Sequence, residues 1–134
     1  MKFRTLVAVP FIALSLVGCG SSDGGSGNGD SGSGGATVPA NTLVVKAIEG
    51  IAWDAKSYVA TAVDGKVSIA IENDSSLPHN LHLLDTDNVD VGLALTVNKR
   101  GDIHSDDYPL APGTYQVICT IAGHGNMKAT LTVK

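Results

Sequence analysis

The sequence predicts an all-β domain, an antiparallel Greek-key β-sandwich, over residues 39–134. Short runs rich in Val, Ile, Thr and Tyr recur along this part of the chain, several with apolar and polar residues in alternation. Turn-forming pairs such as Asp64-Gly65 and Pro112-Gly113 separate these runs. No stretch carries the apolar stripe of an amphipathic helix. About seven short strands in a domain of about 95 residues are typical of such a sandwich.

The segment before this domain resembles a targeting signal. Lys2 and Arg4 are followed by the apolar run Leu6–Val17, which is too short to span a bilayer comfortably. The run ends in "LVGC", which looks like a bacterial lipobox, where signal peptidase cuts before the cysteine and lipid is attached to it. We therefore expect residues 1–18 to be a lipoprotein signal peptide and Cys19 to be the lipidated residue. An uncut transmembrane anchor is the alternative.

Residues 19–38 are expected to form a flexible tether after the lipidated cysteine. They consist mainly of Gly, Ser, Asp and Asn, and cannot bury enough apolar surface to offset the entropy of ordering them. This arrangement predicts an extracytoplasmic domain that is anchored to a bacterial membrane through Cys19.

The expected strands, in chain order, are residues 41–49, 57–62, 66–73, 79–85, 91–97, 114–120 and 128–134. The alternation is clearest in "KVSIAIEN", where Val67, Ile69 and Ile71 fall on one face. Residues 85–113 give the weakest pattern. Within them, residues 91–97 fit a strand or a short irregular segment, and "HSDDYPLAPG" fits a polar loop that ends in a turn.

The net charge of the chain is −4, from nine basic and 13 acidic residues. Removal of residues 1–18 would leave seven basic against 13 acidic residues, a net charge of about −6. Such a charge does not suit nucleic acid or direct adhesion to anionic lipid. The acidic side chains are expected to form a solvated rim, with a docking patch for a basic redox partner as the alternative.

Cys119 would be the only thiol left in the domain if Cys19 carries lipid, so no disulfide can form within the chain. A lone thiol in an oxidising compartment is an apolar filler, a nucleophile or a metal ligand. In "CTIAGHGNM" a histidine and a methionine follow it closely, and the glycines on both sides of the histidine favour a tight loop. His79 begins another strand 40 residues upstream. Each of these residues alone has an ordinary structural explanation.

Taken together, one thiolate, two imidazoles and a thioether are soft donors that exclude calcium and magnesium. A trigonal arrangement of one cysteine and two histidines, with a weakly bound methionine, is typical of copper electron-transfer sites. A closed structural zinc site usually has four strong ligands, whereas only three are present here.

The segments "PHNLHLL" and "PGTYQVICTIAGHGNMKATLTVK" resemble the cupredoxins, the plastocyanin and azurin group of type 1 blue copper proteins. The resemblance implies one copper ion, cycling between Cu(I) and Cu(II). Its four implied ligands are His79, Cys119, His124 and the axial Met127. It also implies that Asn80 reaches Thr120 and ties the two ligand segments together. The spacing from His124 to Met127 is short, as in amicyanins, which leaves the strength of the axial bond open.

The resemblance further implies a membrane-tethered carrier of single electrons and not an enzyme. Its partners would be extracytoplasmic redox proteins, namely a cytochrome, a reductase or a terminal oxidase, and we expect a monomer. The alternative is a copper chaperone or scavenger at the cell surface without redox cycling. The spacing of His79 and His82 does not fit the His-x-His pairs of a multicopper oxidase, and one cysteine cannot bridge a binuclear CuA centre.

Four further residues carry separate expectations. His82 should point away from the metal because strand alternation places it on the other face from His79. His104 should be solvated, and Trp53 should pack in the core or at its edge. Ala122 stands where many family members have proline, so its amide is expected to donate to the Cys119 sulfur and raise the reduction potential.

Overall fold

The structure is a computed structural model that describes residues 37–134. The predicted signal peptide, Cys19 and most of the predicted tether lie outside the described residues. The described part of the chain forms nine strands and no helix. It therefore contains no helix of the length and apolar character needed to cross a membrane.

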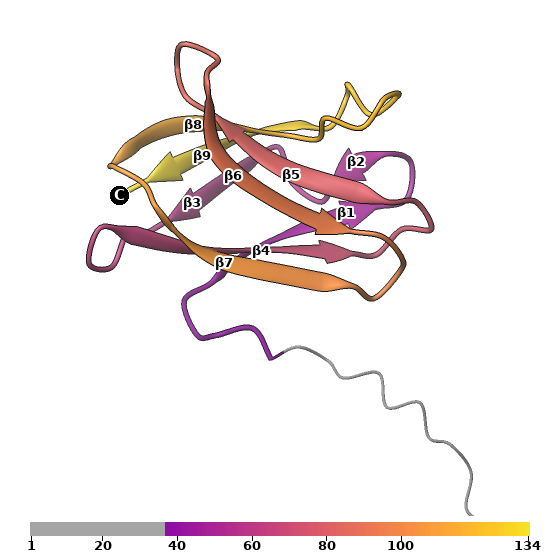
Figure 1. Ribbon diagram of the computed structural model, residues 1–134, viewed down its shortest axis with the longest axis horizontal. Helices are drawn as coiled ribbons and strands as arrows, with labels where there is room; N and C mark the ends of the chain where they lie inside the picture. The colour runs from indigo at the N-terminus through magenta and orange to yellow at the C-terminus, as the bar shows by residue number, and fades with distance from the viewer. Residues whose placement is uncertain (1–36) are drawn as a thin grey trace, which may run out of the picture. The chain divides into compact units, whose positions relative to one another are not determined.

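The strands form two sheets that face each other (Figure 1). The first sheet contains, from edge to edge, β2 (Ala52–Trp53), β1 (Leu43–Ile48), β4 (Lys66–Asn73) and β7 (Ile103–Pro109). The second contains β3 (Ser57–Ala60), β9 (Lys128–Val133), β8 (Gly113–Ile118), β5 (His79–Leu84) and β6 (Asp90–Val97). The all-β prediction is confirmed, and the seven expected strands lie within one or two residues of seven observed ones.

The core lies between the two sheets and is built by the alternation that the sequence shows. Val67, Ile69 and Ile71 of β4 are at most 1% exposed, because every second side chain of the strand faces the second sheet. Leu81 and Leu83 of β5 are fully buried in the same way. Trp53 is also part of the core, as expected.

The prediction of a purely antiparallel sandwich is wrong, because both sheets are mixed. β1 pairs with β4 in parallel, and β3 pairs with β9 in parallel, while the other strand pairs are antiparallel. After β1 and β2 the chain crosses to the second sheet to form β3, and then returns to form β4 beside β1. Period-two alternation identifies a buried face, but it carries no information on strand direction.

The strand β7 was expected to be a polar loop, and the structure corrects this. Its middle residues are exposed and include two aspartates, so it lacks the apolar face of an ordinary strand. β7 is an edge strand that pairs with β4 on one side only, and such strands are commonly charged or end in proline. The sequence of this strand therefore reflects its exposed position.

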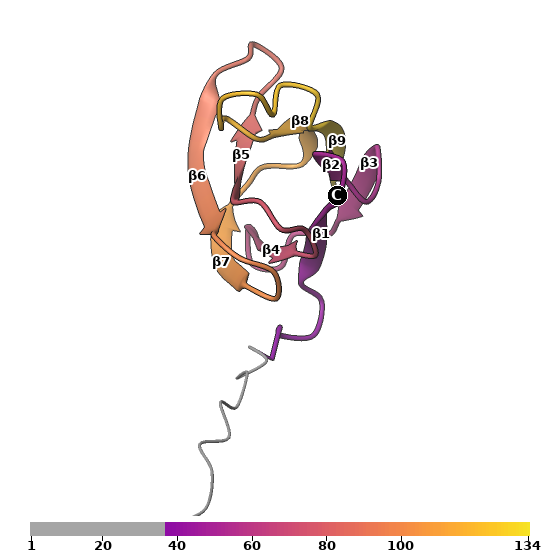
Figure 2. The same ribbon diagram turned by 90° about the vertical axis from the view of Figure 1, so that its right-hand side faces the viewer.

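The two sheets approach each other along β6 and β7, which lie side by side in both views (Figures 1 and 2). The Tyr108 hydroxyl of β7 donates a hydrogen bond to the Val91 carbonyl of β6. The Thr96 amide of β6 donates to Nδ1 of His104 on β7, at 3.2 Å. These two hydrogen bonds join the two sheets along one side, although β6 and β7 do not pair as neighbouring strands of one sheet.

A side chain at Gly92 should destabilise the protein more than one at Gly101. The φ of Gly92 is +95°, and a Cβ atom there would lie 2.8 Å from the Tyr108 hydroxyl oxygen, whereas Gly101 has a φ of +87° and open space around it. We expect Gly101→Ala to lower the unfolding free energy by about 1–2 kcal/mol through backbone strain alone. Gly92→Ala should cost at least about 1 kcal/mol more in urea unfolding, since the overpacking is added. Equal losses in the two variants would contradict the close contact with Tyr108.

Candidate metal centre

The pairing of β5 with β8 brings the two predicted ligand segments together. His82 lies opposite Ile118 and Leu83 opposite Val117, in an antiparallel register. Continued toward the start of β5, this register places Asn80 opposite Thr120. His79, the first residue of β5, therefore begins its strand beside the loop that follows β8.

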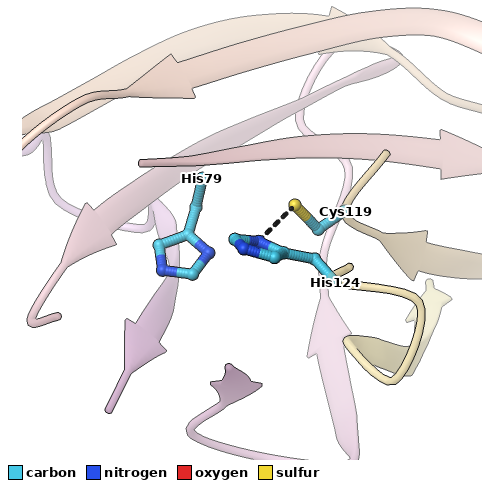
Figure 3. A group of neighbouring side chains, drawn as sticks. All are labelled: His79, Cys119 and His124. Atoms are coloured by element: carbon cyan, nitrogen blue, oxygen red, sulfur yellow. Dashed lines mark hydrogen bonds between the residues drawn. The ribbon is translucent and has the colours of Figure 1, made fainter. Parts of the chain in front are cut away.

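Three side chains converge at this point with their donor atoms close together. His79, Cys119 and His124 each offer one donor atom, and these three atoms lie within 4.8 Å of one another. Figure 3 shows His79 descending from β5 toward the two residues of the loop. The sulfur of Cys119 lies 3.5 Å from Nδ1 of His124, and the two imidazole centroids are 4.9 Å apart. All three residues are at most 6% exposed.

The loop between β8 and β9 folds back through backbone hydrogen bonds among the candidate ligands themselves. The His124 carbonyl accepts from the Met127 amide at 2.9 Å, and the Met127 carbonyl accepts from the Cys119 amide at 3.3 Å. Gly123 has a φ of +88°, a conformation that glycine adopts without strain. Met127 itself is 1% exposed, so its side chain is buried at the same end of the core. The loop thus positions three of the four predicted donors.

Asn80 connects the two ligand segments through its side chain. Its Nδ2 donates to the Thr120 hydroxyl at 2.7 Å, and its Oδ1 accepts from the Thr120 amide at 2.8 Å. Thr120 directly follows Cys119, so this pair of bonds fixes the backbone next to the thiol. The contact is the one that the resemblance implied.

His79 is the least solvated of the three donors. It is fully buried, and its Nε2 lies 2.7 Å from the Ser75 hydroxyl, whereas its Nδ1 has no hydrogen-bond partner. Burial, followed by the nearby imidazole of His124, lowers the pKa of His79 below its ordinary value. The ring is therefore neutral under conditions in which an exposed histidine begins to be protonated, and neutral imidazole is the form that binds metal.

These residues fit a single transition-metal ion. Metal bonds of about 2.0–2.3 Å that meet at about 120° would place the ligand atoms about 3.5–3.8 Å apart. The Cys119 sulfur and Nδ1 of His124 are 3.5 Å apart, and all three donor atoms lie within 4.8 Å of one another. The buried, unpartnered Nδ1 of His79 is the kind of orphan polar atom that a metal would satisfy. One sulfur and two imidazoles with a buried methionine form the donor set of a type 1 copper site.

The structure separates the remaining histidines from this group. His82 is half-buried, and its Nδ1 lies 2.8 Å from the Asp90 carboxylate, so it points away from the donors as expected. His104 is exposed but contacts the Thr96 backbone. Among the described residues, the Cys119 sulfur has His124 as its one hydrogen-bond partner. The expected hydrogen bond from the Ala122 amide is therefore wrong.

Asn73 and Ser75, which lie directly behind His79, were not among the residues predicted from the sequence. Both are at most 1% exposed, although they belong to "ENDSSLP", which has the composition of an ordinary polar turn. A serine four residues before a candidate ligand was the available signal. It is too common a pattern to have identified the contact.

Comparison with solved structures agrees with this assignment, while no protein-family model and no curated protein sequence matches the chain. Auracyanin B is 27% identical, with a TM-score of 0.54 over 72% of this chain and 90% of that one. An azurin from Methylomonas sp. strain J is 15% identical, with a TM-score of 0.58 over 72% and 99%. The purple cupredoxin from Nitrosopumilus maritimus is 17% identical, with a TM-score of 0.54 over 69% and 99%. The last two similarities establish the fold alone, and together the three confirm the cupredoxin resemblance.

The conformation of the ligand loop can be tested with two glycines of similar exposure. Gly123→Ala should lower the unfolding free energy by about 1–2 kcal/mol, because alanine is strained at a φ of +88°. Gly125 has no positive φ and open space around its Cα, so Gly125→Ala is the matched control and should change stability by less than about 0.5 kcal/mol. Urea unfolding of the metal-free protein measures both. A neutral Gly123→Ala would contradict the loop conformation described here.

Proposed function

Because the chain has the cupredoxin fold and that family's His-Cys-His donor group, we propose that it is a membrane-tethered type 1 copper protein. It would carry single electrons between extracytoplasmic redox partners. The observation that carries this proposal is the convergence of one buried thiol and two buried imidazoles from two distant segments. The similarity to auracyanin B and to an azurin supports a blue copper electron-transfer protein in general.

A bound copper ion would supply a one-electron Cu(II)/Cu(I) couple at this site. The protein's part is to hold the donors in one arrangement in both oxidation states. His79 is fixed by Ser75, and Cys119 is held through the Asn80–Thr120 contact. The buried, close-packed surroundings exclude water from the donors. A rigid site of this kind changes little when an electron is transferred, which favours rapid exchange.

The burial of the donors supports a carrier over a copper chaperone. A protein that hands its metal to an acceptor needs ligands that the acceptor can reach, whereas His79 is 0% exposed and the other two strong donors are 6% exposed. The two functions also predict different behaviour in solution. A carrier gives a reversible one-electron couple and keeps its copper, while a chaperone loses copper readily to an acceptor.

The proposed docking surface is the apolar end of the domain around His124. Leu77 is 41% exposed, and Pro78 and Ala122 are also exposed, next to the segments that carry His79 and Cys119. A docking surface built from a few exposed apolar side chains suits a weak, rapidly dissociating encounter. The acidic turn that begins at Asp85 lies at the other end of β5, about 20 Å from His79. We therefore place the docking surface here and not on the acidic turn.

Attachment to the membrane is the part of the proposal that depends on the sequence alone. The lipobox-like "LVGC" and the Gly/Ser-rich residues 19–38 support a lipid anchor at Cys19 with a flexible connection to the domain. Such a tether would keep the carrier near membrane-bound partners while it reorients between them. The expected monomer suits this role.

Colour provides the first test of the proposal, with the chain's two cysteines as a matched pair. The wild-type protein loaded with Cu(II) should be intensely blue from thiolate-to-copper charge transfer. Cys119→Ser should abolish the blue absorption. Cys19→Ser should retain the colour but move the expressed protein from the membrane fraction to the soluble fraction. A colourless wild-type protein would overturn the copper assignment, and a membrane-bound Cys19→Ser variant would overturn the anchor.

The docking surface can be tested by placing one charge at each end of the domain. Ala122→Glu should slow electron exchange with a redox partner at least several-fold and leave the visible spectrum unchanged, because a charge disfavours burial of the apolar surface. Val89, which is 58% exposed in the turn after β5, provides the control Val89→Glu. Stopped-flow oxidation by a bacterial cytochrome measures both variants. Equal rates would exclude this end of the domain as the docking surface.

A further inference from the structure

A buried polar network lies directly behind His79. Asn73 is 0% exposed and Ser75 is 1% exposed, and the other buried polar side chains of the described residues are the candidate ligands His79 and His124. Burial of such groups is costly unless each is hydrogen-bonded, and Asn73 and Ser75 both are. The pair satisfies backbone groups of the turn before β5, and it also places a hydroxyl against a candidate ligand.

The Ser75 hydroxyl is the centre of the network. Its Oγ lies 2.7 Å from Nε2 of His79, 2.9 Å from Oδ1 of Asn73 and 3.2 Å from the Leu77 carbonyl oxygen. The Leu77 amide donates to the same Oγ at 3.2 Å. The orientation of the Asn73 amide is set by its neighbours, because Oδ1 accepts from the Ser75 amide and Nδ2 donates to the Leu77 carbonyl.

The balance of donors and acceptors selects one tautomer of His79. A serine hydroxyl has one proton and two lone pairs. If its proton goes to Oδ1 of Asn73, its lone pairs accept from the Leu77 amide and from an Nε2–H of His79, so every donor has a partner. In the other tautomer the proton would be on Nδ1, which has no hydrogen-bond partner in the described structure. A buried donor without an acceptor is costly, so the network favours the Nε2–H form.

The fold restrains the backbone that carries this hydroxyl. The backbone amide of Asn73 donates to the Asp102 carbonyl at 2.9 Å, and the backbone carbonyl of Asn73 accepts from the Gly101 amide at 2.7 Å. On the outer side of the same turn, the Ser76 amide donates to the Glu49 carboxylate at 3.1 Å. The backbone is therefore held at Asn73 and at Ser76, on both sides of Ser75.

We propose that Ser75 is a positioning residue that holds His79 as the Nε2–H tautomer and keeps the Nδ1 lone pair directed at Cys119 and His124. The metal-binding consequence rests on the proposed function, whereas the tautomer itself does not. The hydroxyl preorganises the ligand before metal arrives, so that binding does not have to reorder the ring or move a proton.

The tautomer can be measured directly in the metal-free protein by long-range ¹H–¹⁵N NMR of the imidazole rings. We expect wild-type His79 to carry its proton on Nε2, and this proton to exchange slowly with water. Ser75→Ala should speed that exchange roughly fivefold or more and introduce the Nδ1–H form. Ser75→Thr, which keeps the hydroxyl, should restore the wild-type spectrum. The matched control is Ser76→Ala, because Ser76 is exposed and uses only its backbone amide in the network.

Copper affinity gives the second measurement on the same variants. Ser75→Ala should weaken binding about 10- to 100-fold, while Ser76→Ala should bind like the wild type. A wild-type His79 that carries its proton on Nδ1 would overturn the proposal, even if Ser75→Ala did not fold. So would a folded Ser75→Ala variant with an unchanged tautomer, exchange rate and affinity. A wild type that shows the Nε2–H form but binds no copper would refute the proposed function and leave the role of Ser75 in fixing the tautomer intact.

Discussion

The backbone pairing of β5 with β8 is the constraint on which the metal centre depends. Its register sets Asn80 opposite Thr120, and so places the first residue of β5 beside the loop that begins at Cys119. Forty residues of sequence separate these segments, and only the sheet brings them together. A shift of one residue in this pairing would turn His79 to the outer face and separate it from the thiol.

Within this frame, the site combines groups that are individually unfavourable in an apolar core. The fully buried imidazole of His79 loses hydration, which lowers its pKa, and its Nδ1 finds no partner in the protein. Two hydrogen-bond networks hold the segments around these donors. One joins Asn80 to Thr120 beside the thiol, and the other joins Ser75 to Asn73 behind the first histidine. The donors are thereby held in place independently of any ion, which is the property that a fast electron carrier requires.

The sequence was informative wherever one residue type is tied to one physical role. Alternating apolar residues located β4 within its observed limits, and the rare combination of thiol, imidazole and thioether identified the donor group. Features that depend on the partner strand were not predictable. The parallel pairing of β1 with β4 leaves no trace in periodicity, and the edge strand β7 resembles a loop because one side of it is unpaired. Ser75 was missed for a similar reason, since its role depends on the ring that packs against it.

X-ray absorption at the copper K-edge of the loaded protein, in both oxidation states, tests the central claim most directly. The account predicts one copper per chain with one sulfur and two imidazole nitrogens as near neighbours, and the same three ligands after reduction. An ion that has oxygen in place of one imidazole would contradict the convergence of the two segments. Loss of a ligand on reduction would contradict the rigid site on which electron transfer is argued to depend.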